Sequence, residues 1–494
     1  MGEGKPFDSL RRLLGRKERE TEKPQPATIV GITSCVYHVP FCRLERGKIG
    51  QAWARRAGLG ERAAIYFDED ALTLGLEAAQ RCIEEKGKAD IEALYFASTS
   101  APFWQRSSAS FMAAACDLPP ECETMDFAGS LRSATSALRA SVDAVSSGRL
   151  SRVLIAAGDV RDGQPGESEE EWFGDAGSAV ILGHDGVIAE ILGMASRSDD
   201  FLDEWRRDSD GFIQTQSSRF TTERGYQASL VAVGQALLQK QGVQPQDCAK
   251  IILPSPDGRA HVNAAKRLGF QDGQIQNPLF QEVGACGSAA PFLLLAAALE
   301  TAKPGERLLL LSYGEGADGF LLQVTEEISK RALPRSLSDH LSEKRLYPSY
   351  QIYKKMRTYY VENAEGPELS NVFLAKEEKQ NVRLYGTHCL RCGTRQYPLA
   401  RVCIACQNHD SLQEVPLERT GHVFTFTRDH LYVAPDVPTI MSVVDLNQGG
   451  RLYIQMTDVD PEDVHIGDEV VLTLRRRKES PTLHHYYWKC RPGR

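Results

Sequence analysis

Residues 173–183 read FGDAGSAVILG, and residues 313–324 read YGEGADGFLLQV. Both stretches open on an aromatic residue and a glycine, continue through small and acidic residues, and end in an apolar run. An earlier stretch is repeated as well, at one constant offset. Gly129, Ser133, Ala134, Leu138, Arg152 and Leu154 have counterparts in Gly284, Ser288, Ala289, Leu293, Arg307 and Leu309. These echoes predict two duplicated α/β halves, each with a helix that begins at the centre of the molecule.

Short apolar runs alternate with longer amphipathic segments between residues 28 and 327. The apolar runs, which we interpret as strands, are residues 93–96, 152–157, 179–182, 250–253 and 307–312. The amphipathic segments include residues 70–85 and 228–240. Strands that are apolar on both faces and separated by helices are typical of a largely parallel sheet covered on both sides. We expect the two halves to occupy residues 28–190 and 191–327.

The composition excludes several classes of protein. A chain of 494 residues is too long for one ordinary core, and 42% apolar with 25% charged residues is typical of globular proteins. Its formal charge of −8 argues against nucleic-acid binding as the main function of the chain. No apolar run reaches the ~18 residues of a membrane-spanning helix, and the charged start lacks the apolar centre of a secretory signal. Twelve cysteines in such a chain indicate thiols or metal ligands, and we expect a cytoplasmic protein.

Two segments differ in composition from the α/β halves. Residues 1–27 combine a short apolar stripe with a mixed-charge run and two prolines, which indicates a charged N-terminal tail. A helix that docks onto a partner is the other interpretation of this tail. Residues 328–381 are polar and rich in tyrosine, with few signs of strands, and we expect a helical linker there.

Four cysteines give the strongest chemical signal in the sequence. Cys389 and Cys392 form one Cys-x-x-Cys pair, and Cys403 and Cys406 form a second, with ten residues between the pairs. Two such turns present four thiolates to one metal ion, as a structural zinc requires. Four sulfur ligands leave no coordination position open for a substrate. We therefore predict a structural Zn²⁺ in a ribbon over residues 382–412.

The last segment, residues 413–494, has the alternating pattern of a small β-barrel. Its alternating runs, broken by glycine and aspartate, are residues 422–427, 439–444, 451–457 and 469–474. This pattern is typical of the oligonucleotide/oligosaccharide-binding (OB) fold. The basic run at residues 475–478 would suit nucleic acid, but no aromatic residues interleave with it and acidic residues lie close by in sequence. We expect no nucleic-acid binding.

Several motifs in residues 28–326 resemble those of the hydroxymethylglutaryl-CoA synthase branch of the thiolase superfamily, in its archaeal and bacterial form. Ketoacyl-carrier-protein synthase III is a more distant relative of this branch. The motifs are ERGKIGQAW (45–53), YFDEDALTLGLEAA (66–79), FGDAGSAVILG (173–183), PDGRAHVNAAKRLGF (256–270) and YGEGADGFLLQV (313–324). Residues 382–494 resemble the zinc-ribbon/OB-fold proteins that accompany such enzymes and help to shape their acyl-CoA channel. The resemblance implies an α/β, duplicated five-layer thiolase fold, followed by a rubredoxin-like zinc ribbon and a small OB-type β-barrel.

The resemblance also locates the family's catalytic set, and this chain departs from it at each position. The family's cysteine nucleophile lies at the start of the first central helix, where this chain has Leu131, which cannot form a thioester. The family's histidine position holds Pro254, and its asparagine position holds Ala285. Thr99 stands where the synthases have a general-acid glutamate. The resemblance therefore implies a chain without the covalent chemistry of its family.

Three neighbouring residues are candidate substitutes. Ser130 precedes Leu131, but a serine nucleophile needs an adjacent base, and the expected histidine is missing. Cys286 begins the second central helix, whose dipole would lower the pKa of a thiol; a small core residue is the other interpretation. His261 is expected on a helix, either as a satisfied histidine or as a displaced base.

Two main hypotheses for the function follow. The first is a subunit without catalysis of its own that works in complex with an active thiolase-type enzyme on a (3-keto)acyl-CoA. The second is an enzyme with altered, non-covalent C–C bond chemistry on an acyl-CoA, such as an aldol or retro-aldol reaction. The resemblance further implies a homodimer, or a heteromer with a thiolase-like enzyme, and a coenzyme A thioester as ligand. We expect no membrane partner.

Overall fold

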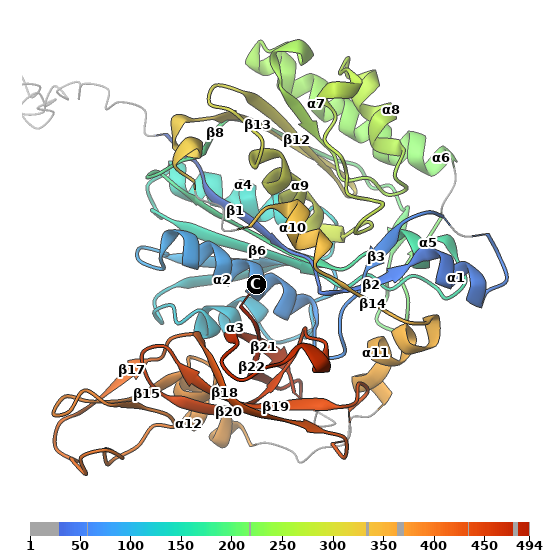
Figure 1. Ribbon diagram of the computed structural model, residues 1–494. Helices are drawn as coiled ribbons and strands as arrows, with labels where there is room; N and C mark the ends of the chain where they lie inside the picture. Colours follow the sequence, from blue (N-terminus) through green and yellow to red (C-terminus); the bar gives the residue numbers. More distant parts are fainter. Residues whose placement is uncertain are drawn as a thin grey trace, which may run out of the picture.

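A computed structural model describes residues 29–494, apart from 57, 217–218, 332–334, 363–369, 433, 478–482 and 494. The N-terminal tail expected at residues 1–27 lies outside the described residues. Two α/β halves are stacked on one another, and a smaller β-rich unit packs beneath them in the view of Figure 1. We call the stacked halves the body.

The first half is built on five strands and three helices. The strands are β1 (Gly31–His38), β4 (Ala93–Ala97), β5 (Glu123–Phe127), β6 (Val153–Asp159) and β7 (Ala176–Gly183). The helices are α2 (Ala71–Lys86), α3 (Ser108–Ala115) and α4 (Ser133–Ser146). The strands lie in the order β5-β4-β6-β7-β1, so β5 forms an edge of the sheet.

The second half repeats this plan. Its strands are β8 (Ala189–Ser198), β11 (Lys250–Ile252), β12 (Arg307–Tyr313) and β13 (Gly316–Val324), and its helices are α7 (Ala228–Gln241), α8 (Ala260–Arg267) and α9 (Ala290–Leu299). The order β11-β12-β13-β8 matches β4-β6-β7-β1 strand for strand, and a parallel bridge from Ile251 to Ile275 lies where β5 lies in the first half. The predicted duplication is confirmed.

The sheet is mixed, so the prediction of a largely parallel sheet is wrong. β4 pairs in parallel with β5 and β6, and β11 with β12. The other pairings in this sheet are antiparallel. Only the two residues 314–315 separate β12 from β13, and strands joined so closely run antiparallel. Apolar runs reveal buried strands but not the direction in which each strand runs.

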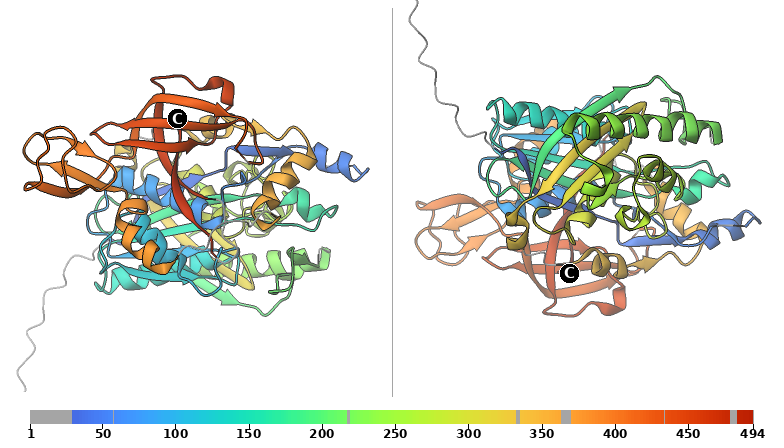
Figure 2. Two further views of the ribbon diagram at one scale, coloured as in Figure 1. Left: turned by 90° about the horizontal axis from the view of Figure 1, so that it is seen from below. Right: turned by 90° about the horizontal axis from the view of Figure 1, so that it is seen from above.

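Helices and strands form five layers. α4 and α9 pack together between the halves, where every residue of α9 is buried. α2 and α3 cover the outer face of the first half, and α7 and α8 cover that of the second (Figures 1 and 2). A helix that is apolar all round is a buried helix, which explains the central place of α9.

The position of α2 follows from its first residues and from two glycines beneath it. Asp70 caps the helix by accepting from the Thr73 N–H at 2.9 Å, while the Thr73 hydroxyl accepts from the Asp70 N–H at 2.8 Å. A Cβ on Gly158 would lie 2.0 Å from the Ala71 carbonyl oxygen, and one on Gly177 would lie 2.0 Å from that of Leu74. These glycines let the helix backbone approach β6 and β7.

Short elements complete the body. They are β2 (Cys42–Glu45), α1 (Arg46–Ala52), β3 (Glu61–Ala63), α5 (Ser168–Trp172), β9 (Glu204–Trp205), β10 (Gln214–Thr215), α6 (Arg219–Thr221), α10 (Leu337–Ser342), β14 (Arg345–Leu346), α11 (Tyr350–Glu362) and α12 (Asn371–Asn381). The expected linker is helical but also carries β14, which pairs with β2. The buried Tyr347 hydroxyl donates to the Ile65 carbonyl at 2.7 Å, so this segment packs against the body.

The C-terminal unit holds a ribbon and a closed barrel. The ribbon strands are β15 (Tyr385–Cys389), β16 (Arg395–Gln396) and β17 (Leu412–Pro416). The barrel closes in the order β18 (Thr420–Asp429), β19 (Thr439–Leu446), β20 (Arg451–Met456), β22 (Tyr486–Pro492) and β21 (Glu469–Arg476). The runs predicted from the sequence fall on β18, β19, β20 and β21, although β20 ends one residue before its run does, and the fifth strand, β22, was not predicted.

Buried charges join the barrel to the body. Arg475, with a side chain 2% exposed, contacts Glu69 of the body and Asp458 of the barrel. The Lys489 ammonium lies 2.7 Å from an Asp68 oxygen, and the Arg491 guanidinium lies 2.5 Å from Glu77. The basic run at 475–478 therefore begins with a residue that is buried at this junction. Residue 478 lies outside the described residues.

Candidate functional site

A cavity lies where the two central helices begin. Leu131, Pro254 and Ala285 all line it, although they come from three distant segments of the chain. Phe173, Tyr226 and three prolines give it a mainly apolar wall, and we call it the apolar chamber. The structure therefore brings together three of the four positions that the resemblance assigns to catalysis.

A second cavity adjoins the first and shares Leu131, Arg161 and Glu204 with it. Thr99, the fourth position, lies there together with Ser130. The remaining lining includes acidic and basic side chains, and we call this cavity the polar chamber; its charged residues are Arg161, Asp203, Glu204, Arg206 and Glu315. All four positions that the resemblance assigns to catalysis thus line these two adjoining chambers.

Glycines make the turn at the start of α9 possible. Gly284 has φ +98° and Gly287 has φ +58°, in the region that favours glycine. A Cβ on Gly284 would lie 2.8 Å from the Trp172 carbonyl oxygen, and one on Gly287 would lie 2.2 Å from an Asp159 oxygen. Both glycines line the apolar chamber and have no side chain, so the backbone itself forms this part of the chamber wall.

Ser130 lies just before α4, and its hydroxyl is hydrogen-bonded to a carboxylate rather than to an imidazole. Its hydroxyl donates to a Glu315 carboxylate oxygen at 2.5 Å and accepts from the Arg132 N–H at 3.2 Å. Neither chamber includes a histidine among its described lining residues. Ser130 therefore lacks the Ser–His arrangement that activates a serine.

Cys286 lines the apolar chamber but is only 1% exposed. Its thiol donates to the Gly284 carbonyl oxygen at 3.3 Å. Burial raises the pKa of this thiol well above its usual value, and the Asp175 carboxylate raises it further, against the lowering effect of Arg43. The expected lowering by the helix dipole is outweighed by desolvation, because the thiol lies inside the core.

His261 lies on α8, as expected, and is buried outside both chambers. Its Nδ1 lies 3.1 Å from the Ser255 hydroxyl, and burial lowers its pKa. The structure therefore places it as a neutral histidine in contact with Ser255, which itself lines the apolar chamber.

Asp159 at the end of β6 organises the turn that carries Thr99. One carboxylate oxygen accepts from the Ser98 hydroxyl at 3.0 Å, the Thr99 N–H at 2.7 Å and the Ser100 hydroxyl at 2.9 Å. The other accepts from the Ser288 N–H at 2.7 Å, just before α9. One buried carboxylate therefore ties the wall of the polar chamber to the start of the second central helix.

An ion pair between Arg161 and Glu204 lies at the boundary of the two chambers, and sequence reasoning missed it. The Arg161 guanidinium also lies 4.5 Å from the centre of the Phe173 ring and 3.4 Å from the Thr99 hydroxyl. Burial lowers the pKa of Arg161, but the Glu204 and Asp159 carboxylates outweigh this effect and raise it overall. Arg161 therefore stays charged inside the site.

Two tyrosines of the apolar chamber were missed as well. The Tyr226 hydroxyl donates to the Pro254 carbonyl at 2.6 Å, and the Tyr313 hydroxyl donates to an Asp203 oxygen at 2.5 Å. Burial raises the pKa of Asp203, although the hydrogen bond from Tyr313 lowers it. Tyr313 is the first residue of the motif at 313–324, so the sequence could have identified it as a site residue. Nothing in the sequence indicates that residue 203 contacts Tyr313.

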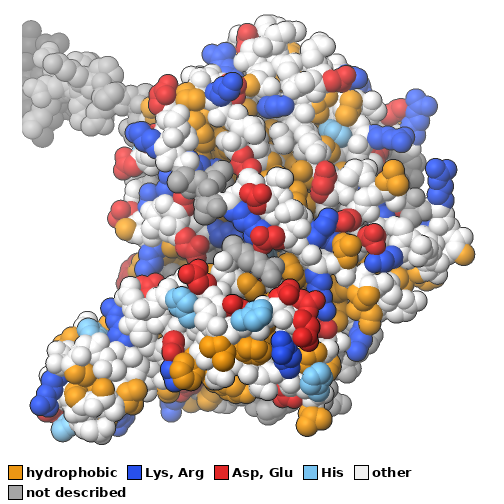
Figure 3. All heavy atoms as spheres, in the orientation of Figure 1, with side chains coloured by type: hydrophobic (Ala, Val, Ile, Leu, Met, Phe, Trp, Pro, Cys, Tyr) orange, Lys and Arg blue, Asp and Glu red, His pale blue; other side chains and the backbone are white. Residues whose placement is uncertain are grey.

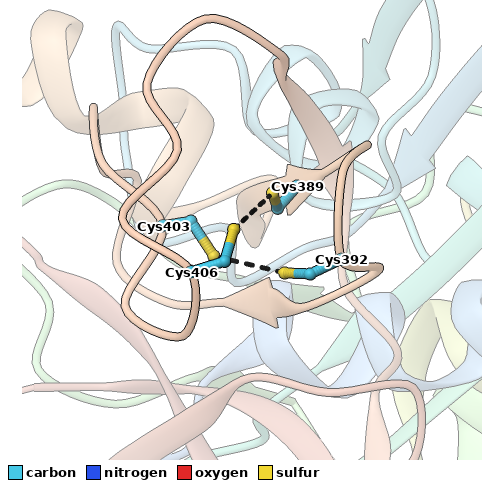
Figure 4. A group of neighbouring side chains, drawn as sticks. All are labelled: Cys389, Cys392, Cys403 and Cys406. Carbon is cyan, nitrogen blue, oxygen red and sulfur yellow. Dashed lines mark hydrogen bonds between the residues drawn. The ribbon is translucent and has the colours of Figure 1, made fainter.

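The four ribbon cysteines come together in two facing turns (Figure 4). Their sulfur atoms all lie within 4.8 Å of one another, with 3.6 Å between Cys389 and Cys406 and 3.5 Å between Cys392 and Cys403. Tetrahedral zinc–sulfur bonds of about 2.3 Å require sulfur atoms about 3.8 Å apart. The cluster therefore fits a zinc ion held by four thiolates. Cys490 lies apart from it, buried in the barrel.

Known proteins resemble both parts of the chain. The family model for the C-terminal domain of 3-oxoacyl-[acyl-carrier-protein] synthase III matches residues 238–322, and that for the C-terminal OB-fold domain of ChsH2 matches residues 414–475. Hydroxymethylglutaryl-CoA synthase from Pyrococcus horikoshii is 30% identical over 346 residues, which are 68% of this chain and 98% of that protein. The enzyme of the same name from Methanocaldococcus jannaschii is 30% identical over 341 residues, 67% of this chain and 99% of that protein.

The chain belongs to the hydroxymethylglutaryl-CoA synthase family. Solved structures agree with the predicted duplicated five-layer thiolase fold. One, a hydroxymethylglutaryl-CoA synthase complexed with CoA, has a TM-score of 0.61 at 17% identity and covers 69% of this chain and 92% of its own. Another, 3-oxoacyl-(acyl carrier protein) synthase III from Pseudomonas aeruginosa, has a TM-score of 0.55 at 17% identity and covers 60% and 98%.

The family assignment covers the body and leaves about a third of the chain beyond the synthase relatives. The ChsH2-type model over residues 414–475 and the closed five-stranded barrel agree with the predicted OB fold at the end of the chain. None of the described helices has the length and apolar character needed to cross a bilayer.

Proposed function

We propose that this synthase-family chain binds a (3-keto)acyl-CoA without forming an acyl-enzyme. In this proposal it works as a non-catalytic subunit beside an active thiolase-type enzyme that supplies the nucleophile. The observation that carries the proposal is the convergence of Leu131, Pro254 and Ala285 on one cavity. A covalent synthase needs a thiol, an imidazole and an amide there, and none of these three side chains can attack a carbonyl or transfer a proton.

The nearby substitutes do not restore this chemistry. Ser130 is hydrogen-bonded to Glu315, and neither chamber places a described histidine beside it. Cys286 is buried, and its raised pKa keeps it protonated at neutral pH. The fold and the pocket are thus kept, while the groups for thioester formation are replaced.

The zinc and the assembly belong to the same proposal. Four thiolates would hold Zn²⁺ as a structural ion that fixes the ribbon, with no coordination position for substrate. The body presents β5 as an open sheet edge, which suits a second copy or a thiolase-like partner.

Mass spectrometry of the intact chain tests the proposal. We expect no acyl-shifted mass after incubation with acetyl-CoA or acetoacetyl-CoA, in conditions where an authentic thiolase is acylated. Purification from the native host should also recover a thiolase-type protein bound to the chain. An acyl group found on Ser130 or Cys286 by peptide mapping would contradict the proposal.

A second candidate is non-covalent C–C bond chemistry, as in an aldol or retro-aldol lyase or transferase. The Arg161–Glu204 and Tyr313–Asp203 pairs favour it, because each places a carboxylate at the site that could accept a proton from a substrate. Backbone N–H groups at the starts of α4 and α9 could stabilise an enolate oxygen. This candidate requires turnover of an acyl-CoA by the purified chain, retained after thiolase has been removed and reduced by Glu204→Gln.

A further inference from the structure

The apolar chamber is small for an acyl site. Its volume is about 70 Å³, against about 120 Å³ for the adjoining polar chamber. A buried group the size of a water molecule needs ~10–15 Å³ of such a volume, so the apolar chamber holds roughly five non-hydrogen atoms. This is the size of an acyl group of about four carbon atoms. The volume by itself therefore indicates a short acyl group.

The apolar chamber is also the part of the site that suits a carbon chain. Phe173, Tyr226 and three prolines make its wall mainly apolar, whereas several charged side chains line the polar chamber. On the face drawn in Figure 3, the apolar side chains of the two halves are interspersed with charged ones, and the described residues of the halves form no broad apolar surface there. A carbon chain that outgrows the apolar chamber into the polar one would therefore meet charged groups, which must lose hydration.

Tyr226 joins the chamber wall from an unusual turn of helix. It is 4% exposed and belongs to a π-helical segment, Thr222–Gln227, that continues directly into α7. A π-helix closes each hydrogen bond over one residue more than an α-helix, which turns the side chains on its two sides by about 100° relative to a continuous α-helix. Single π-helical turns are frequent at functional sites. This segment therefore helps to set the direction in which Tyr226 points.

Several contacts hold the Tyr226 ring in place. Its hydroxyl donates to the Pro254 carbonyl at 2.6 Å, and its ring meets the edge of the Tyr313 ring, with 5.5 Å between the ring centres and 70° between the planes. Gly225 allows this approach, because a Cβ there would lie 2.5 Å from the Tyr313 hydroxyl oxygen and 2.8 Å from the Phe201 ring. The ring also packs in the core of the second half. It therefore cannot turn away from a longer ligand without losing these contacts.

We propose that Tyr226 limits the acyl group of the bound CoA thioester to about four carbon atoms. This inference rests on the proposed function, because it names the class of acyl group that the same cavity takes. A longer acyl group has two ways to fit, and both are costly. It must displace the Tyr226 ring, which loses its packing and its hydrogen bond to Pro254, or it must extend into the polar chamber beside Asp203 and Glu315. Tyr226 thus determines specificity through its size.

Calorimetric titration of the full chain tests this role of Tyr226, with acetoacetyl-CoA, 3-oxooctanoyl-CoA and free coenzyme A as separate ligands. Free coenzyme A separates the contribution of the acyl group from that of its carrier. We expect the wild type to bind acetoacetyl-CoA at least about tenfold more tightly than 3-oxooctanoyl-CoA, because the longer chain overfills the chamber. Tyr226→Leu should reduce this preference at least about threefold, and Tyr226→Ala should abolish or reverse it, because each smaller side chain leaves room to bury further methylene groups. Thermal unfolding followed by circular dichroism shows that each variant is folded, and Tyr226→Leu is sufficient for the test if Tyr226→Ala does not fold.

Tyr347→Leu is the matched control. Tyr347 is likewise a buried tyrosine whose hydroxyl donates to a backbone carbonyl, that of Ile65, but it lines neither chamber. This variant should keep the preference of the wild type. Three outcomes overturn the inference and leave the proposed function standing: equal binding of the two thioesters by the wild type, an unchanged preference in the Tyr226 variants, or the same change of preference in Tyr347→Leu. If the wild type binds neither thioester, the proposed function falls together with the inference.

Discussion

The resemblance assigns Leu131 to the position of the family's cysteine nucleophile, and the residues around Leu131 predict that a cysteine placed there would not be sufficient for catalysis. The side chain lines both chambers at the start of α4, so a thiol there would meet the helix N-terminus. Pro254 and Ala285 across the apolar chamber offer neither an imidazole nor an amide. A thiol at residue 131 would therefore be accessible but would have no base to return a proton to the leaving group.

The Leu131→Cys variant tests this reasoning. We expect iodoacetamide to alkylate the new thiol, because it lines an open cavity, whereas Cys286 of the wild type stays unmodified because burial raises its pKa. We expect no condensing activity from this variant. Peptide mass spectrometry measures the labelling, with Cys286→Ser in the same background as control. Labelling of Cys286 in the native wild type would contradict the account of that residue.

Asp458 at the junction gives a pH dependence with a defined sign. Burial raises the pKa of Asp458 from 3.8 to about 6, against the lowering effect of the Arg475 guanidinium. The folded chain therefore binds more protons than the unfolded chain between pH ~4 and ~6, and the free energy of unfolding falls as pH rises through that window. A shift of this size corresponds to about 3 kcal/mol.

The Asp458→Asn variant should lose this component. We expect the stability of the wild type relative to the variant to decrease from pH 4.5 to pH 7, in urea unfolding followed by circular dichroism. Asp445→Asn is the control in the same barrel, because Arg451 lowers the pKa of Asp445 and its contribution changes in the opposite direction, at lower pH. A pH-independent difference between wild type and Asp458→Asn would refute the assigned shift.

At the scale of elements, local sequence predicted more about where elements lie than about how they are joined. Apolar runs located β4, β6, β7, β11 and β12, and the Cys-x-x-Cys pairs located the ribbon turns. Both signals depend only on residues that are close together in the sequence. The direction in which each strand runs could not be predicted from such local signals, and strand β22 was missed. β22 carries Tyr486, Lys489 and Arg491, whose polar ends reach body residues, so its pattern lacks the alternation of a half-exposed strand.

The ribbon provides the prediction at this scale. Cys403→Ser should reduce bound zinc from one ion per chain to near zero, because three thiolates hold zinc less tightly and the buried Cys403 cannot be replaced by a neighbour. Elemental analysis of the purified chain measures the zinc content. Cys490→Ser is the matched control, a buried cysteine of the barrel outside the cluster, and should retain the ion. Equal zinc in both variants would show that the cluster is not the metal site.

At the scale of the whole molecule, long-range contacts explain what the sequence could not reveal about the site. The resemblance placed Leu131, Pro254, Ala285 and Thr99, and the structure brings these positions together. The pair formed by Arg161 and Glu204 joins the segment after β6 to the short strand β9, and neither residue lies in a recognisable motif. Such pairs become visible only when the fold has placed both elements at one cavity.

The open edge of the large sheet carries the last prediction, which concerns assembly. β5 pairs with β4 on one side only, and Met125 on it is 43% exposed. An unpaired strand edge is a template for another strand, so two copies that join through β5 would continue the sheet across the molecule. We expect the wild type to sediment as a dimer.

Met125→Lys should shift the monomer–dimer equilibrium toward the monomer. The two introduced lysines would face each other across the two-fold axis, where their charges repel and both must lose hydration on association. Sedimentation velocity over a range of concentrations measures the effect, and Leu202→Lys, at a position 62% exposed between β8 and β9, is the matched control. If the wild type stays monomeric at high concentration, β5 remains available to a different thiolase-type chain. The co-purified partner should then form a complex with the wild type, and Met125→Lys should weaken that complex. If the variant neither dissociates the dimer nor weakens that complex, β5 is not the interface.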